Sequence, residues 1–168
     1  DMFEKAYLLL GSNRGNRSEM LAKARELIDE QIGNIIKSSS VYETAPWGFD
    51  DKVSFLNQVI YIETLYNPFC LLDQLLQIES YIGRIRTSKN YSSRNIDIDI
   101  LFFNDYVIND KHLVIPHPRL HLRRFTLIPM AEIAGDYIHP LFNRSIEALL
   151  KECNDTKEVK LFVPGKTS

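Results

Sequence analysis

Hydrophobic positions along the chain follow two periods, and their order predicts an α+β fold. Apolar stripes with helical spacing cover residues 17–32 and 68–82, and each follows directly after a capping residue, Asn16 or Asn67. Glycines are expected to end both helices. Alternating or continuous apolar runs predict strands at 5–10, 35–44, 55–65 and 93–103. The order βαββαβ is that of a ferredoxin-like sandwich, an antiparallel sheet with helices on one face.

The residues after this core predict a smaller extension. Short apolar runs predict strands at 106–108, 113–115 and 159–163. Helical patterns cover 125–134 and 146–150, and either Asn143 or Ser145 caps the second of these. We therefore expect one domain over residues 1–168, with a ferredoxin-like core and a C-terminal helical extension.

The strand at residues 93–103 carries the strongest chemical signal. Ile96, Ile98 and Ile100 are expected on one side of a central strand covered on both faces. The other side would carry two carboxylates and two apolar side chains: Asp97, Asp99, Leu101 and Phe103. Residues i and i+2 of a strand lie roughly 6.5–7 Å apart, so the neighbouring anions favour a shared Mg²⁺ site. The alternative is the solvated end of an edge strand.

Two basic segments flank this strand. Residues 84–94 hold four cations and no acid, which indicates either a solvated loop or a mobile arginine lid over phosphates. Residues 111–124 hold His112, His117 and His121 among four further cations. A second phosphate-contacting segment is favoured there over a zinc site, because the histidine spacing is a weak zinc signal.

Three other features bear on a site. Residues 11–16 predict a tight turn and not a phosphate loop, because the P-loop pattern is absent. Glu79 lies at the margin of an apolar stripe, where it is either a surface side chain or a buried carboxylate with a partner. Trp47, Phe55 and Phe125 with the amide of Asn57 suit a flat heteroaromatic ring.

Composition excludes several classes of protein. The 168 residues are 45% hydrophobic, with a formal net charge of −2, which argues against nucleic-acid or anionic-membrane binding. No apolar run is long enough for a membrane span, and no signal-peptide pattern is present. Cys70 and Cys153 have no metal or redox spacing, which fits free thiols in the cytoplasm.

Several motifs together resemble the 6-hydroxymethyl-7,8-dihydropterin pyrophosphokinase family of folate biosynthesis. They are Leu10-Gly11-Ser12-Asn13, residues 42–48 (YETAPWG), Phe55-Leu56-Asn57, Ile78-Glu79, residues 83–86 (GRIR), residues 94–100 (RNIDIDI), Pro116-His117, Arg123 and Phe125. In this order and spacing, over nearly the whole chain, they are specific.

The resemblance implies transfer of the pyrophosphoryl group of ATP to the pterin, with release of AMP. The expected partners are these two small molecules, and we expect the protein to be a monomer. Asp97 and Asp99 would hold two Mg²⁺ ions and share catalysis with Arg84 and Arg94. The implied ATP-binding residues are Glu79, Arg84, Arg86, Tyr91, Arg94, Ile100, His112, Leu113, Val114, His117 and Arg123. The implied pterin-binding residues are Thr44, Ala45, Trp47, Gly48, Phe55, Asn57, Asp97 and Phe125.

Two alternatives belong to other classes. A Mg-dependent nucleotidyltransferase also combines a Gly-Ser turn with a D-x-D strand, but its two motifs are usually close in sequence, whereas Ser12 and Asp97 are far apart. A ferredoxin-like RNA-binding module is disfavoured, because its aromatic-rich motif is absent and the net charge is negative.

Overall fold

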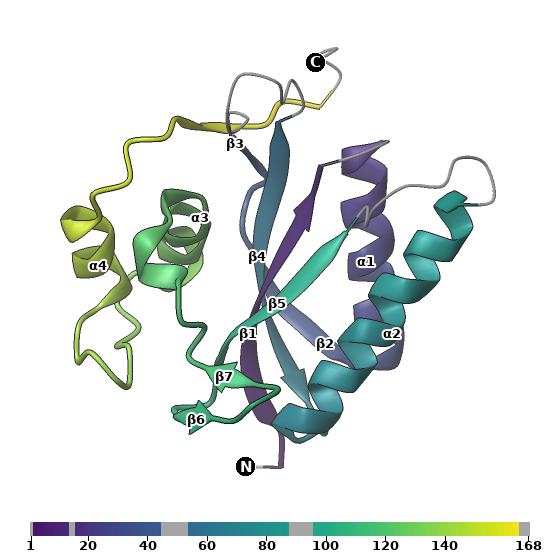
Figure 1. Ribbon diagram of the computed structural model, residues 1–168, viewed down its shortest axis with the longest axis horizontal. Coiled ribbons are helices and arrows are strands. Elements are labelled where there is room, and N and C mark those ends of the chain that lie inside the picture. Colours follow the sequence, from purple (N-terminus) through teal and green to yellow (C-terminus); the bar gives the residue numbers. More distant parts are fainter. Residues whose placement is uncertain (1, 14–15, 45–53, 88–95, 165–168) are drawn as a thin grey trace.

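The computed structural model describes residues 2–13, 16–44, 54–87 and 96–164, and for residues 85–87 it describes the backbone alone. A large antiparallel sheet runs through the molecule (Figure 1). The strands are β1 (Glu4–Ser12), β2 (Gly33–Ser38), β3 (Tyr42–Thr44), β4 (Phe55–Thr64), β5 (Asp97–Phe103), β6 (Ile108–Asn109), β7 (Val114–Ile115) and β8 (Val159–Leu161). The helices are α1 (Arg17–Gln31), α2 (Pro68–Thr87), α3 (Arg124–Ala134) and α4 (Ile146–Glu152), with a 3₁₀ turn at Leu120–Leu122.

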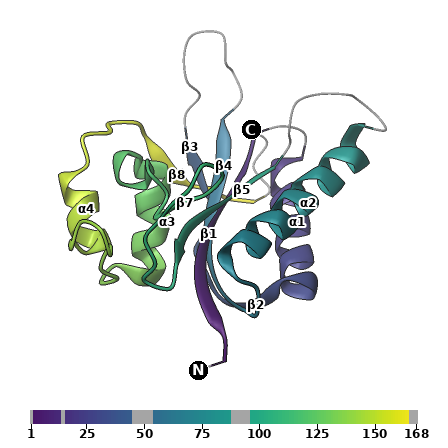
Figure 2. The ribbon, with the colours of Figure 1, turned by 60° about the horizontal axis from the view of Figure 1, so that its bottom comes forward.

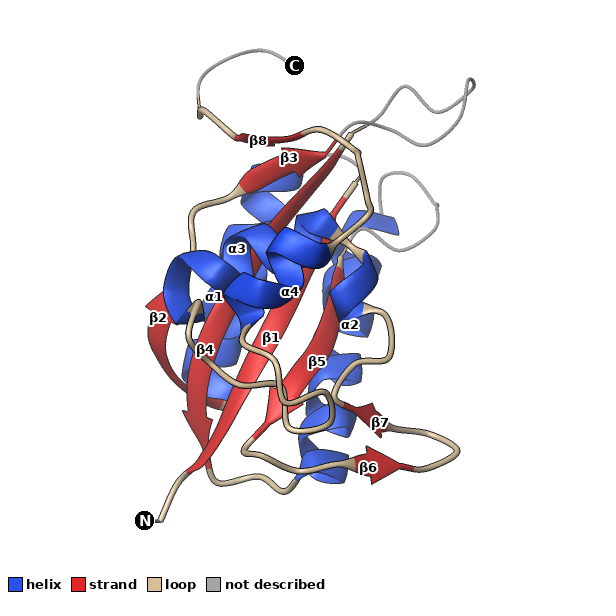
Figure 3. Cartoon of the chain, turned by 90° about the vertical axis from the view of Figure 1, so that its left-hand side faces the viewer, coloured by secondary structure: helices blue, strands red, loops and turns tan. Residues whose placement is uncertain are grey.

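The strand order confirms the ferredoxin-like plan. Neighbouring strands follow the order β5-β1-β4-β3-β8, β2 also pairs with β4, and all these pairs are antiparallel. The last strand, β8, lies beside β3 and extends the sheet (Figure 3). The short strands β6 and β7 pair with each other as a separate hairpin.

Helices cover both faces of the sheet, whereas the ferredoxin-like order predicted helices on one face only. The coverage of both faces that was expected for the strand at 93–103 is confirmed. Helices α1 and α2 lie on one face, and α3 and α4 lie on the other (Figure 2). Strands β1 and β5 bury apolar side chains on both sides: Leu8 and Ile98 under α1 and α2, and Leu9 and Leu101 under α3 and α4. The C-terminal extension therefore closes a second apolar face.

The sequence had predicted a central strand at this position, but β5 lies at the edge of the sheet. Within the described part of the chain it hydrogen-bonds to β1 alone. It is nevertheless buried along most of its length, and only its first residue, Asp97, is exposed. The burial of both faces explains why its composition resembles that of a central strand.

An irregularity in β5 overturns the predicted position of Phe103. Tyr7 pairs with Phe102 and Leu8 pairs with Ile100, so β5 carries one extra residue at this point. Beyond this bulge the alternation is inverted. Phe103 therefore packs in the core under α1 and α2, and not on the face of the two aspartates.

The single strand predicted at 35–44 is in fact two strands, β2 and β3. Ser39 stands between them, and its N–H donates to the carbonyl of Val59 at 2.9 Å while its Oγ accepts from the N–H of Val59 at 3.0 Å. The side chain of Gln58 donates to the carbonyl of Ser39 at 2.6 Å. Such side-chain bonds compete with the regular ladder, so the strand is interrupted although both halves still pair with β4.

The predicted helix starts are confirmed, but one predicted end is wrong. The side chains of Asn16, Asn67 and Ser145 accept hydrogen bonds from backbone N–H groups in the first turns of α1, α2 and α4. Helix α2 continues through Gly83, where a Cβ atom would meet nothing within 4 Å. The backbone of residues 84–87 is therefore helical and does not belong to a loop. None of the described helices is long and apolar enough to cross a membrane.

Candidate active site

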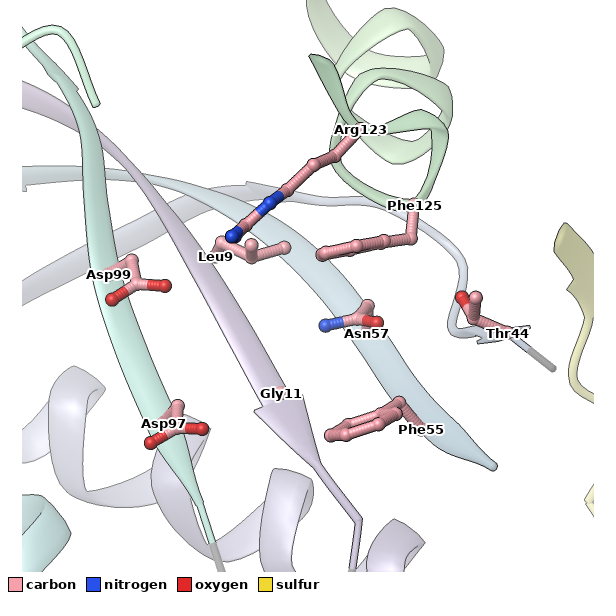
Figure 4. Close-up of a pocket in the computed structure, with 9 residues that line it drawn as sticks. All are labelled: Leu9, Gly11, Thr44, Phe55, Asn57, Asp97, Asp99, Arg123 and Phe125. Carbon is pink, nitrogen blue, oxygen red and sulfur yellow. The ribbon is translucent and has the colours of Figure 1, made fainter. Parts of the chain in front are cut away.

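A pocket opens at the end of the sheet where β1 finishes and β4 and β5 begin (Figure 4). The first turn of α3 covers one side of it. The described residues that line the pocket are Leu9, Gly11, Thr44, Phe55, Asn57, Asp97, Asp99, Arg123 and Phe125. Seven of these nine had been assigned to a site from the sequence. The fold brings these seven residues together, although they lie up to 81 positions apart in the chain (44 to 125).

The alternation of β5 places the two aspartates side by side in this pocket. Asp97 pairs with Gly11 and Asp99 pairs with Leu9 across the β1–β5 ladder. Ile98, between them, points into the opposite core. Asp97 is exposed and Asp99 is partly buried, so their oxygens face an open cavity. Two carboxylates on one face that leave room for further oxygen ligands fit a hard cation such as Mg²⁺.

Two aromatic rings form the apolar part of the pocket. Phe55 begins β4, and Phe125 stands in the first turn of α3. In Figure 4 the two rings lie on either side of the Asn57 side chain. A flat heteroaromatic ring inserted between them would contact both π-faces and reach the amide.

The hydrogen-bonding groups beside these rings are buried. The Asn57 side chain is almost fully enclosed, and its Nδ2 approaches the carbonyl of Leu10 at 3.5 Å. The hydroxyl of Thr44 is also buried and has no hydrogen-bond partner among the described residues. A buried polar atom without a partner is costly, so a ligand bond at Thr44 would relieve this cost.

A cationic side chain faces the two aspartates. Figure 4 shows the guanidinium of Arg123 directed toward Asp99, and its carbon Cζ lies 5.4 Å from the ring centroid of Phe125. Burial and the nearby charge of Arg119 lower the pKa of Arg123, while Asp99 opposes that shift. Arg123 remains charged near neutral pH and suits phosphate oxygens.

His117 lies beside this group, next to Asp99. Its backbone N–H donates to the carbonyl of Leu101 at 2.9 Å, and its Nδ1 accepts from the N–H of Arg119 at 3.1 Å. Burial lowers the pKa of His117; Asp99 opposes this, and Arg123 and Arg119 reinforce it. The neutral ring is therefore favoured, with its proton on Nε2, where it can be donated to a ligand oxygen.

Other residues expected to bind ATP lie elsewhere in the structure. Arg84 is on α2, where it donates to Oγ of Ser80 at 2.9 Å and lines a groove against α1. Glu79 is buried on α2 beneath β5. Ile100 and Leu113 belong to the core, and His112 and Val114 are exposed on the β6–β7 hairpin.

Several expected residues fall outside the described part of the chain. These are Ala45, Trp47, Gly48, Tyr91 and Arg94, together with the side chain of Arg86. Zinc had been disfavoured for the histidine segment, and within the described residues no three or more His, Cys, Asp or Glu side chains group to hold a metal ion.

The pocket also contains two residues that had not been assigned to a site from the sequence. Leu9 and Gly11 come from β1, and Gly11 lies within the strand and not in a turn. Strict alternation from the buried Leu8 and Leu10 places both on the opposite face, so this signal was available in the sequence. Ser12 also belongs to β1, and beyond it only Asn13 and Asn16 of the predicted turn are described.

The fold and this site define a class of protein, the ferredoxin-like proteins with a carboxylate-lined pocket at one end of the sheet. The chain belongs to the 7,8-dihydro-6-hydroxymethylpterin-pyrophosphokinase (HPPK) family, whose family model matches residues 7–135. This match includes all nine residues that line the pocket.

Curated relatives and solved structures agree with this assignment. The chain is 43% identical over 129 residues to the 2-amino-4-hydroxy-6-hydroxymethyldihydropteridine pyrophosphokinase of Bacillus subtilis, covering 76% of this chain and 77% of the relative. It is 37% identical over 158 residues to the enzyme of that name from Haemophilus influenzae, covering 93% and 97%. A solved Plasmodium falciparum HPPK-DHPS structure (A437G with SDX-DHP) superposes with a TM-score of 0.76 at 21% identity. That match covers 89% of this chain but only 45% of the longer solved chain, and it supports the fold.

Proposed function

We propose that this protein transfers the pyrophosphoryl group of ATP to the hydroxymethyl oxygen of 6-hydroxymethyl-7,8-dihydropterin. The hydroxyl oxygen bonds to the β-phosphorus, the bond from that phosphorus to the α–β bridging oxygen breaks, and the hydroxyl proton is lost. The products are the pterin diphosphate and AMP. The observation that carries this proposal is the placement of Asp97 and Asp99 in one pocket with Phe55 and Phe125.

The pterin would lie between Phe55 and Phe125, because its flat ring can stack on both aromatic side chains. The Asn57 amide and the Thr44 hydroxyl would bind its hydrogen-bonding edge, because both are buried at the wall of the pocket. In this orientation the hydroxymethyl group would point toward the aspartates. On the basis of the family resemblance alone, the backbone of residues 45–48 is proposed to form further hydrogen bonds with the same edge of the pterin.

Asp97 and Asp99 would hold Mg²⁺, for which their paired oxygens on one face of β5 are suited. We propose two ions, as the family resemblance implies. Bound Mg²⁺ would neutralise phosphate charge and orient the β-phosphorus for in-line attack. The role of the protein would be to hold the two carboxylates at the wall of the pocket, next to the pterin site.

The triphosphate would lie along the cationic side of the pocket. Arg123 and the Nε2–H of His117 would bind phosphate oxygens, and their proximity to Asp99 supports this role. Arg84, Arg86, Tyr91 and Arg94 are proposed as further phosphate or nucleotide contacts. In this structure the Arg84 side chain donates a hydrogen bond to Oγ of Ser80. A contact with ATP therefore requires this hydrogen bond to break and the side chain to turn away from the surface of α2.

Product analysis tests this function. The protein would be mixed with ATP, Mg²⁺ and 6-hydroxymethyl-7,8-dihydropterin, and nucleotides and pterins would be separated by chromatography. We expect AMP and the pterin diphosphate in equal amounts, with no free pyrophosphate. ADP would indicate a simple kinase, and free pyrophosphate with AMP attached to the acceptor would indicate nucleotidyl transfer. Either product would contradict the proposal.

A further inference from the structure

Glu79 occupies an unusual position for a carboxylate. It lies on α2 with only 8% of its surface exposed, and its Oε2 accepts a hydrogen bond of 2.7 Å from the backbone N–H of Ile98. This distance lies at the short end of the range for N–H···O bonds, so the contact is a close one. The helix side chain therefore holds a backbone group of the neighbouring strand.

The amide of Ile98 needs such a partner because of its place in the sheet. Strand β5 pairs with β1 on one side, and no strand of the described chain pairs with its other side. In an antiparallel ladder alternate residues turn their N–H groups away from the neighbouring strand. The side chain of Ile98 is buried under α2, so an unpaired N–H at this residue would be shielded from water.

Ile98 is also the single residue between the two aspartates. Its side chain faces α1 and α2, while Asp97 and Asp99 face the pocket on the opposite side of the sheet. Glu79 thus acts from behind the strand and does not line the pocket. A bond at this amide restrains the peptide groups on either side of Ile98, and with them the directions of both carboxylates.

We propose that Glu79 is a positioning residue that holds the Asp97-Ile98-Asp99 segment in register and thereby presents both carboxylates to one cation. This inference rests on the proposed function for its catalytic consequence, but not for its structural content. It differs from the direct nucleotide contact expected from the sequence. An acceptor oxygen is what position 79 supplies, and a negative charge reaching ATP is not required.

Amide hydrogen exchange in the free protein, followed by NMR, tests the structural content. Glu79→Gln keeps an acceptor oxygen for Ile98, and Glu79→Leu removes it while retaining an apolar side chain. Gln77→Ala, at an exposed position of the same helix, is the matched control. We expect exchange at the Ile98 amide to be at least about tenfold faster in Glu79→Leu and within about threefold of wild type in the other two variants. Unchanged exchange in Glu79→Leu would overturn the proposal.

Cation binding and turnover test the consequence. Mn²⁺ alone, titrated by electron paramagnetic resonance, should bind about tenfold more weakly to Glu79→Leu than to wild type and nearly normally to Glu79→Gln. With substrates, Glu79→Leu should lose kcat with little change in the KM for ATP, and Glu79→Gln should restore kcat.

If Glu79→Gln is as impaired as Glu79→Leu and raises the KM for ATP, the charge contacts the nucleotide and the proposal is wrong. If Glu79→Leu does not fold, the Glu79→Gln comparison with wild type still decides between an acceptor and a charge. Failure of the wild type to form AMP would refute the proposed function alone, because exchange and Mn²⁺ binding are measured without substrate.

Discussion

A Cβ atom at Gly11 would lie 2.9 Å from Nδ2 of Asn57, closer than real Cβ atoms approach a neighbour. Gly11 pairs with Asn57 across the β1–β4 ladder, and both line the pocket. The missing side chain at position 11 therefore leaves the space in which the Asn57 amide lies. This contact links a backbone requirement of β1 to the expected recognition of the pterin edge.

The first prediction concerns this contact. In Gly11→Ala the new methyl group would displace the Asn57 amide and weaken its bond to the pterin, so we expect binding of 6-hydroxymethyl-7,8-dihydropterin to weaken about tenfold, or roughly 1.4 kcal/mol. Calorimetric titration would measure the dissociation constant. Gly83→Ala is the control, because a Cβ there meets nothing within 4 Å. An unchanged dissociation constant in Gly11→Ala would show that Asn57 does not contact the pterin.

The second prediction concerns stability at Gly83. This residue lies inside α2, where glycine is less favourable than alanine. Gly83→Ala should raise the free energy of unfolding by about 0.5–1 kcal/mol, as measured by urea denaturation. Pterin binding should not change. A loss of stability would mean that position 83 is not helical in solution.

The third prediction concerns the aromatic pair. Phe125→Ala removes one wall of the pterin site and the ring that Arg123 approaches at 5.4 Å. We expect pterin affinity to fall between about tenfold and a hundredfold, as is usual for the loss of an aromatic contact face. Fluorescence titration would measure this. Phe69→Ala, at an exposed position at the start of α2, serves as the control and should bind normally.

The fourth prediction concerns the pH dependence of folding. Nδ1 of His139 accepts hydrogen bonds from the N–H groups of Leu141 and Phe142, both at 3.1 Å, and the ring stacks on Phe142. Burial, and secondly the charge of His121, lower the pKa of His139 to about 4. The native state therefore favours the neutral ring. Its stabilising contribution is complete above the unfolded pKa of roughly 6.5 and is lost as the pH falls toward 4.

His139→Asn provides the comparison. Asparagine can accept the same backbone bonds but does not titrate in this range. Between pH 7 and pH 4.5 the wild type should lose on the order of 2 kcal/mol more free energy of unfolding than the variant. Parallel pH profiles of the two proteins, measured by urea denaturation, would show that His139 is not the titrating group.

Local sequence signals predicted the elements and the face of most site residues. Period-two alternation in β5 placed Asp97 and Asp99 on one face, and the cap residues Asn16 and Asn67 marked the starts of two helices. These signals succeed because they depend on neighbouring residues and on the geometry of one element.

The errors arose where tertiary contacts decide the outcome. The bulge in β5 depends on pairing with β1, and the break at Ser39 depends on bonds to β4. The edge position of β5 depends on the order of the whole sheet. Glycine at position 83 is compatible with both a helix end and a helix interior, so the residue type did not predict the extra turn that holds Arg84.

The central claim is that Asp97 and Asp99 hold the metal at which pyrophosphoryl transfer occurs. Single-turnover quench experiments, with enzyme and ATP in excess over the pterin and with saturating Mg²⁺, would measure AMP formation in Asp97→Asn and Asp99→Asn. Asp105→Asn, an exposed carboxylate just beyond the same strand, is the matched control. We expect AMP formation to fall by about a thousandfold or more in the first two variants and to be unchanged in the control. A near-wild-type rate in either Asp97→Asn or Asp99→Asn, with the fold intact, would contradict the account.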